Sequence, residues 1–174
     1  SSVTVVSTVS AVNILALHKI MDPVLCICEF IGCSHTVVWP VICAGTVEYH
    51  GPHCSYGCDT LIAEGLIKKL AEKKEIMIAP TIYYSPSSYA VADETSGTVH
   101  IEEDVFEAYL FQIFTNMLDA GLRNIYVVIH HQFEQENLMP MTLSYMKAAK
   151  RATMRYLEKT QGRGWWGSEN YASY

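Results

Sequence analysis

From residue 36 onward, apolar residues follow two different spacings along the chain. Three runs are almost continuously apolar and rich in β-branched residues, as expected of buried strands: TVVWPVICAGTV (36–47), EIMIAPTIYY (75–84) and NIYVVIHH (124–131). Three other segments carry apolar residues at helical spacing: 60–74, 100–121 and 136–160. The pattern predicts strands that alternate with helices.

Residues at the segment ends support this interpretation. The segment 60–74 ends in lysines, which suit the negative end of a helix dipole. The segment 100–121 has acids in its first turn and Gly121 as a C-cap, and Pro140 lies near the first turn of the last helix. We therefore predict an α/β fold with a mostly parallel sheet flanked by helices on both faces.

The domain is predicted to span residues 36–174, and residues 1–35 stay unassigned. That first segment is apolar and rich in Ser and Thr, but it lacks the pattern of a secretory leader. No apolar run reaches the roughly 18 residues that a membrane helix needs. The expectation is a soluble, cytoplasmic protein that does not enter a membrane.

Composition narrows the classes of function. The chain has 174 residues, 50% of them hydrophobic, with a formal charge of −6, so it fits one globular domain and offers no basic face for nucleic acid. All six cysteines lie in the first third of the chain, in spacings that match no zinc knuckle. We interpret them as reduced thiols.

The segment GTVEYHGPHCSYGCDT (45–60) concentrates acids and imidazoles after the first predicted strand. Glu48 and His50 point to one side if the chain is extended, and the turn at Gly51-Pro52 can return the backbone so that Asp59 lies near them. Two histidines end the strand 124–131 at the same predicted sheet edge. Such donors suit a divalent metal ion, although Asp59 as a plain helix cap stays an alternative.

These residues carry a resemblance to a known family. GTVEYHGPHCSYGCDTLIAEGL, followed by SGTVHI and AGLRNIYVVIHH, resembles the creatininase (creatinine amidohydrolase) family, whose hallmark is Glu-x-His-Gly-Pro-His with Asp-Thr shortly after it. The resemblance covers roughly residues 36–160. It implies a creatininase-like α/β fold, two divalent metal ions, Zn or Mn, and a homo-oligomer, often a hexamer.

The resemblance also implies roles for single residues. It makes Glu48, His50 and Asp59 metal ligands, with Asp59 bridging the two ions. The ligand at the strand end is His131. His53 matches a motif position just outside the ligands, and we assign it to catalysis.

The last acidic ligand stays open, because IHHQFEQEN departs from the family's usual sequence there. Glu134 lies nearest to His131, whereas Glu136 with Asn137 reproduces a Glu-Asn pair of the family. We assign Glu136 to the metal and Glu134 to catalysis. The chain also ends at Tyr174, before the family's His-Ala-Gly segment, so the domain is expected to be truncated at its C-terminus.

The function implied by the resemblance is hydrolysis of a small molecule. Metal-activated water would cleave a cyclic amide or another C–N bond. Alternatives are a family member that acts on a carbocyclic ketone of the inosose type or on a formamide, and a non-catalytic metal-binding assembly subunit.

Overall fold

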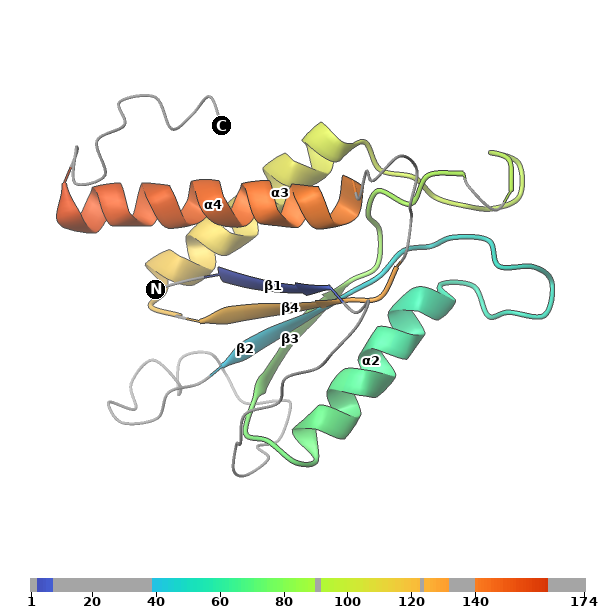
Figure 1. Cartoon of the computed structure of the whole chain (residues 1–174), viewed down its shortest axis with the longest axis horizontal. Coiled ribbons are helices and arrows are strands. Elements are labelled where there is room, and N and C mark those ends of the chain that lie inside the picture. Colours follow the sequence, from blue (N-terminus) through green and yellow to red (C-terminus); the bar gives the residue numbers. More distant parts are fainter. Residues whose placement is uncertain (1–2, 8–38, 90–91, 123, 132–139, 163–174) are drawn as a thin grey trace.

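The computed structural model describes residues 3–7, 39–89, 92–122, 124–131 and 140–162 (Figure 1). Four strands and three helices lie within these residues. They are β1 (Val3–Ser7), β2 (Pro40–Ala44), α2 (Cys58–Ala71), β3 (Met77–Ile82), α3 (Glu103–Asp119), β4 (Ile125–Ile129) and α4 (Pro140–Gln161).

The strands form one sheet in the order β1-β4-β2-β3, and every neighbouring pair is parallel. The central pair is in register with Val41 opposite Tyr126 and Ala44 opposite Ile129. The predicted α/β fold with a mostly parallel sheet is therefore confirmed. The edge strand β1 lies within the segment 1–35, for which the apolar pattern predicted no element.

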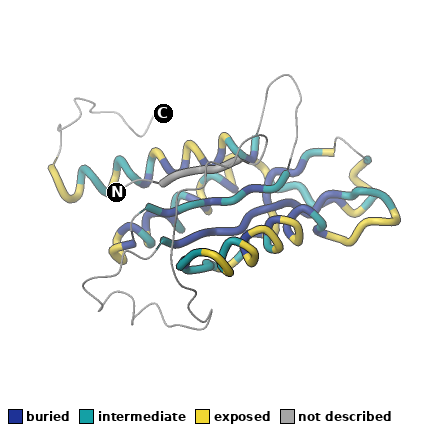
Figure 2. Tube along the Cα trace, turned by 60° about the horizontal axis from the view of Figure 1, so that its bottom comes forward, coloured by how far each residue is buried: buried dark blue, intermediate teal, exposed yellow. Residues whose placement is uncertain are grey.

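Helices cover both faces of the sheet. In Figure 1, α2 lies on one face and α3 with α4 on the other, and Figure 2 shows buried strands between helices that expose their outer sides. Residues of β2 alternate between two apolar clusters: Val41 and Cys43 pack with α2, whereas Ile42 and Ala44 pack with α3 and α4. Both faces of β2 are thus buried, which explains its continuous apolar run.

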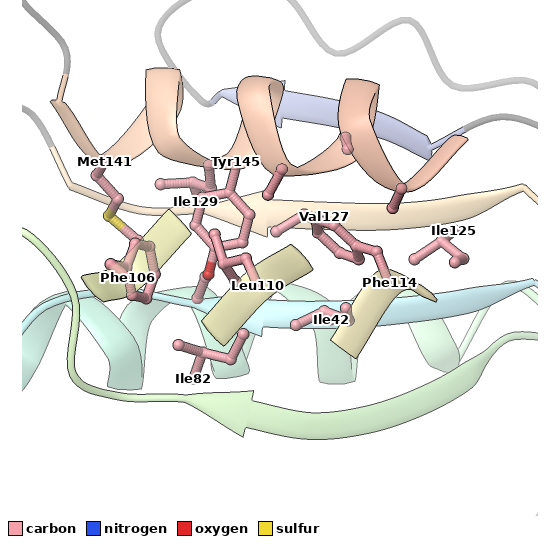
Figure 3. Close-up of a cluster of buried hydrophobic side chains, with 14 of the residues drawn as sticks. Ile42, Ile82, Phe106, Leu110, Phe114, Ile125, Val127, Ile129, Met141 and Tyr145 are labelled. Carbon is pink, nitrogen blue, oxygen red and sulfur yellow. The ribbon is translucent and has the colours of Figure 1, made fainter. Parts of the chain in front are cut away.

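The larger cluster lies between the sheet and the pair α3 and α4 (Figure 3). Tyr145 of α4 meets Phe106 edge-on, with ring centroids 5.4 Å apart, and Phe114 lies on its other side at 6.3 Å. All three rings are almost completely buried. Close packing of these rings locks the two helices onto the sheet.

The predicted helices are present with shorter bounds: α3 has Ala120 rather than Gly121 as its C-cap, and the predicted first residues of the last helix, 136–139, lie outside the described residues. α4 begins at Pro140, and Gly121 follows α3 with φ +93°, the left-handed conformation that glycine adopts readily. α2 begins two residues earlier than predicted, at Cys58. None of the helices in the described ranges has the length and apolarity required to cross a membrane.

Candidate metal centre

The candidate site lies at the carboxyl ends of β2 and β4, where the chain leaves β2 toward α2 (Figure 1). Gly45 sets how close α2 comes to the sheet. A Cβ atom at this position would lie 2.5 Å from the Thr60 backbone nitrogen and 2.6 Å from its Cα. Only glycine allows the end of β2 to touch the first turn of α2.

Beyond Gly45 the chain stays extended because residues 98–99 form hydrogen bonds with its backbone. The Val99 amide donates to the Val47 carbonyl at 2.8 Å, and the Tyr49 amide donates to the Thr98 hydroxyl at 3.0 Å. In extended chain every second side chain points to the same side. Thr46, Glu48 and His50 therefore face one side together.

The chain then turns back and enters α2. Gly51 and Gly57 both have positive φ, +90° and +73°, and Gly57 is the N-cap of α2. No side chain caps this helix, so the alternative that Asp59 is merely a helix cap is wrong. The Asp59 carboxylate instead accepts a hydrogen bond from the Thr46 hydroxyl at 2.7 Å.

The end of β4 supplies the histidines. The His130 amide donates to the Ala44 carbonyl at 3.0 Å, so the pairing of β4 with β2 extends one residue past the strand. His131 then turns its side chain inward, where only 3% of its surface is exposed. Its Nδ1 lies 3.0 Å from Asp59 Oδ2 and 3.1 Å from the Thr46 hydroxyl.

The structure brings four of the predicted ligands together: Glu48, His50, Asp59 and His131. Glu48 Oε2 lies 3.5 Å from His131 Nδ1 and 3.7 Å from His50 Nε2. His50 Nε2 lies 3.5 Å from Asp59 Oδ1. Residues 72 positions apart in sequence thus share one cluster.

Both carboxylates of the cluster are buried, with 6% of Glu48 and 4% of Asp59 exposed. Burial raises the pKa of Glu48, because neighbouring His131 and His50 offset the lost hydration only in part. Burial also acts to raise the pKa of Asp59, but hydrogen bonds from His131 and Thr46 outweigh it and the pKa falls below its ordinary value. The site therefore favours the protonated form of Glu48 more than usual, whereas it favours the charged form of Asp59.

The histidine ring nitrogens fit a bound cation. His50 Nδ1 lies 3.1 Å from the Glu48 carbonyl oxygen, which can only accept, so Nδ1 carries the proton and Nε2 turns a lone pair toward the carboxylates. His131 Nε2 is buried and has no hydrogen-bond partner among the described residues. In the metal-free chain His131 Nδ1 donates to Asp59 Oδ2, and its lone pair becomes available to a cation when the proton moves to Nε2.

Two groups of donor atoms meet the spacing that a metal ion needs. Glu48, Asp59 and His131 form one group, and His50, Cys58 and Asp59 form the other, with the donor atoms of each group within 4.8 Å of one another. Asp59 belongs to both. Its Oδ2 faces His131 and its Oδ1 faces His50, so the carboxylate has one oxygen for each group.

The other predicted site residues are not part of this cluster as described. His53 lies in the exposed turn 51–57, where its ring stands beside Gly51 in space that a Cβ atom there would crowd. It has no hydrogen bond or ion pair with the four clustered residues in the described part of the chain. Glu134 and Glu136 lie outside the described residues, so their roles stay predictions.

Three further residues join the neighbourhood: the sequence analysis missed Thr46 and gave no ligand role to Cys58 or to His130, which is one of the two histidines that end the predicted strand. Thr46 supports both Asp59 and His131, Cys58 belongs to the second donor group, and His130 Nδ1 lies 3.6 Å from Asp59 Oδ1. The period of two that joins Glu48 and His50 also includes Thr46 and could have identified it. Cys58 offered a weaker signal, its position beside Asp59 in the first turn of α2.

Comparison with solved structures gives the fold an independent context. A structure titled creatininase Mn aligns with a TM-score of 0.67 at 17% sequence identity, covering 79% of this chain and 52% of that one. A mutant creatininase of Zn-Zn type and a mutant creatininase complexed with creatine align with TM-scores of 0.63 and 0.62, each at 16% identity, covering 80% of this chain and 52% of theirs. The chain thus spans about half the length of these structures.

Sequence comparison assigns the family. No curated protein sequence matches the chain. The family pattern of creatininase, described as creatinine amidohydrolase, matches residues 29–172, which include the sheet edge and its cluster. By this match, and in agreement with its fold, the chain belongs to the creatininase family.

Proposed function

We propose that the chain binds two divalent metal ions at the carboxyl edge of its sheet and hydrolyses a cyclic amide or another C–N bond of a small molecule. The observation that carries the proposal is the position of Asp59 between the two donor groups. A carboxylate with one oxygen directed to each group is suited to bridge two cations. Membership of a family described as creatinine amidohydrolase supports the reaction class.

Zinc or manganese fits the donors. Solved relatives carry titles that name Mn and Zn-Zn forms, and carboxylate with imidazole suits both ions. Such ions lower the pKa of bound water and polarise a carbonyl group, which is the chemistry that amide hydrolysis needs. The relative complexed with creatine supports a small guanidino compound as the class of substrate or product.

Different residues would bind the metal ions, position the ligands and border the entrance of the site. Glu48, Asp59 and His131 form the buried, oxygen-rich half of the site, and Thr46 holds the last two in place. His50 closes the outer side, where 31% of its side chain is exposed. A substrate would enter from that side.

His53 is proposed as a proton-transfer residue at the same mouth. Its imidazole is exposed in the turn after His50, so a substrate could reach it without displacing the buried ligands. The proposed partner in this role, Glu134, follows His131 in sequence.

The experiment that tests the proposal is Asp59→Asn. The carboxamide keeps the shape of the side chain but offers only one oxygen, so the variant should lose at least one of two metal ions per chain while staying folded. Elemental analysis of the purified protein counts the ions, and circular dichroism checks the fold.

Asp93→Asn is the matched control. Asp93 is an exposed acid in a turn, its carboxylate accepts hydrogen bonds from the Thr95 amide and hydroxyl, and its substitution should leave the metal content unchanged. Full metal content in Asp59→Asn would refute the bridge. A wild-type chain that holds two ions yet hydrolyses no amide, formamide or carbocyclic ketone would favour the non-catalytic metal-binding subunit.

A further inference from the structure

Cys58 stands at a position where a thiol has chemical consequences. It is the first residue of α2, directly before Asp59, and its thiol is free and half-buried. Its Sγ atom lies within 4.8 Å of donor atoms of both His50 and Asp59. Three different donor types, nitrogen, oxygen and sulfur, therefore face one small volume.

The neighbours of Cys58 leave their donor atoms available. The proton of His50 is held at Nδ1 by the Glu48 carbonyl, so Nε2 offers its lone pair on the side of Asp59 Oδ1. Asp59 Oδ1 lies 3.5 Å from His50 Nε2, while its hydrogen bonds from Thr46 and His131 go to Oδ2. The second donor group thus keeps an imidazole nitrogen and a carboxylate oxygen for a ligand, and His130 Nδ1 approaches that oxygen only to 3.6 Å.

We propose that Cys58 binds one of the two metal ions through its sulfur, together with His50 and Asp59. The inference rests on the proposed two-metal function and assigns the chemistry of its outer site. On binding, the S–H bond of Cys58 breaks, the proton passes to solvent, and a sulfur lone pair forms the bond to the cation. The inner group of Glu48, Asp59 and His131 contains no sulfur.

The required adjustment is small. Donor atoms around a tetrahedral zinc ion, with bonds of about 2.0 to 2.3 Å, are roughly 3.3 to 3.8 Å apart. The donors of the outer group, which lie within 4.8 Å of one another, therefore need to close by about 1.5 Å at most. His50 has 31% of its side chain exposed, which leaves its ring room to move.

A sulfur ligand would give the two sites different metal preferences. Thiolate favours zinc, cobalt and cadmium, whereas an oxygen-rich site also accepts manganese and magnesium. We expect the outer site to select a thiophilic ion while the inner site stays permissive. The chain would then hold two unlike ions when both kinds are supplied.

Cobalt substitution of the full chain tests the inference with a readout other than activity. Cobalt(II) bound to thiolate shows an intense charge-transfer band in the near ultraviolet, which imidazole and carboxylate ligands do not produce. We expect this band in the wild type. Cys58→Ser should abolish it and weaken the outer site by about tenfold or more, whereas Cys58→Asp should restore the second cobalt ion without the band.

Cys54→Ser is the matched control. Cys54 lies four positions earlier in the exposed turn and belongs to neither donor group, so its loss should leave the band intact. Every other cysteine of the chain is retained in each variant. A band that persists in Cys58→Ser would therefore come from another thiol and would overturn the inference.

Alkylation of the wild type gives a second measurement that needs no variant. Mass spectrometry should show Cys58 reacting with iodoacetamide about tenfold or more slowly when cobalt is bound, with Cys54 unaffected. Equal alkylation of Cys58 with and without bound cobalt would overturn the inference. Two bound cobalt ions with no thiolate band refute Cys58 as a ligand but leave the two-metal function standing, whereas no bound cobalt refutes both.

Discussion

The helix-covered core and the carboxyl edge of the sheet use the same two strands for opposite purposes. In the core, Ile42 of β2 and Val127 of β4 lie among apolar side chains and almost no polar atom interrupts them (Figure 3). A few residues further along, the same two chain segments bury Glu48 and His131 beside a second acid. Burial of apolar groups stabilises the folded chain, whereas burial of neighbouring carboxylates opposes folding.

Because the core buries apolar groups and the edge buries charged groups, the core is expected to determine stability and the edge to determine metal binding. Burial raises the pKa of Glu48 and so disfavours its charged form, which costs folding free energy in the metal-free chain, whereas the hydrogen bonds that lower the pKa of Asp59 stabilise the charged form of that acid. A cation that binds only the folded chain would offset this cost through mass action. Changes in the core should therefore alter stability alone, and changes at the edge should alter metal affinity first.

The largest effect is expected from Phe114→Ala. Phe114 is completely buried between α3, α4 and the sheet, and removing its ring should lower the free energy of unfolding by about 3–5 kcal/mol. Urea titration measures the loss. The folded fraction should keep the metal content of the wild type, and Val105→Ala, on the exposed side of the same helix, should change stability by no more than about 0.5 kcal/mol. Loss of metal from the folded Phe114→Ala protein would contradict the expectation that changes in the core alter stability alone.

Gly45→Ala should link the two regions, because Gly45 lies where the strand meets the site. Its new methyl group would collide with the Thr60 backbone, which cannot yield as a side chain can, so stability should fall by about 1–3 kcal/mol. Displacement of α2 should also weaken metal binding through Asp59.

Gly65→Ala is the control for this glycine. Gly65 lies inside α2 with nothing within 4 Å of an added Cβ, so alanine should stabilise the helix by about 0.5–1 kcal/mol. Thermal unfolding compares both variants with the wild type. A Gly45→Ala protein as stable as the wild type would show that strand and helix are not held at this contact.

Thr46→Val should act mainly on the edge. The substitution keeps the size of the side chain but removes the hydroxyl that donates to Asp59 and contacts His131. Loss of such a supporting hydrogen bond should weaken metal affinity about 10- to 100-fold, with a stability cost near 1 kcal/mol. Metal titration by calorimetry measures the affinity.

Thr81→Val separates this effect from the general loss of a hydroxyl. Thr81 donates to Glu64 at 2.9 Å, in a contact that neither donor group includes, so metal affinity should stay unchanged. Equal weakening in both variants would contradict a positioning role for Thr46.

The smallest effect on stability is expected from Glu48→Gln in the metal-free protein, and it should be a gain rather than a loss. Because burial raises the pKa of Glu48 in the folded chain above its value in the unfolded chain, the folded chain takes up the proton first as the pH falls, and its relative stability rises in that range. At neutral pH, Glu48→Gln should therefore slightly stabilise the metal-free protein and remove this pH-dependent component. Metal affinity should fall sharply.

Glu64→Gln should lower the stability of the metal-free protein at neutral pH, the opposite of the effect expected for Glu48→Gln. A hydrogen bond from Tyr83 lowers the pKa of Glu64, so its contribution to stability is present at neutral pH and is lost as the pH falls through the folded-state pKa. Urea titrations at several pH values after chelation compare the two variants. A Glu48→Gln protein that is less stable than the wild type at neutral pH would show that the carboxylate stabilises the metal-free edge.

Local patterns were sufficient for the helices and the central strands, since their periodicity repeats over many residues. Where it is described, α4 (Pro140–Gln161) follows the predicted helix 136–160 to within one residue of its end, and β2 is buried on both faces, as its continuous apolar run indicated. The edge strand β1 escaped notice because a strand this short, in a segment without regular spacing, is defined only by its partner β4. Strand pairing is a long-range contact that no local window contains.

The same limit applies to the candidate site. The sequence by itself placed Glu48 and His50 on one side of an extended segment and put a histidine at the end of a parallel strand, because backbone periodicity and sheet topology fix both. Only the tertiary structure decided that Thr46 and Cys58 join them, and that Asp59 turns one oxygen to His131 and the other to His50. Those contacts depend on the distance between α2 and β2. This distance is short because Gly45 has no side chain, and even a methyl group there would collide with the Thr60 backbone.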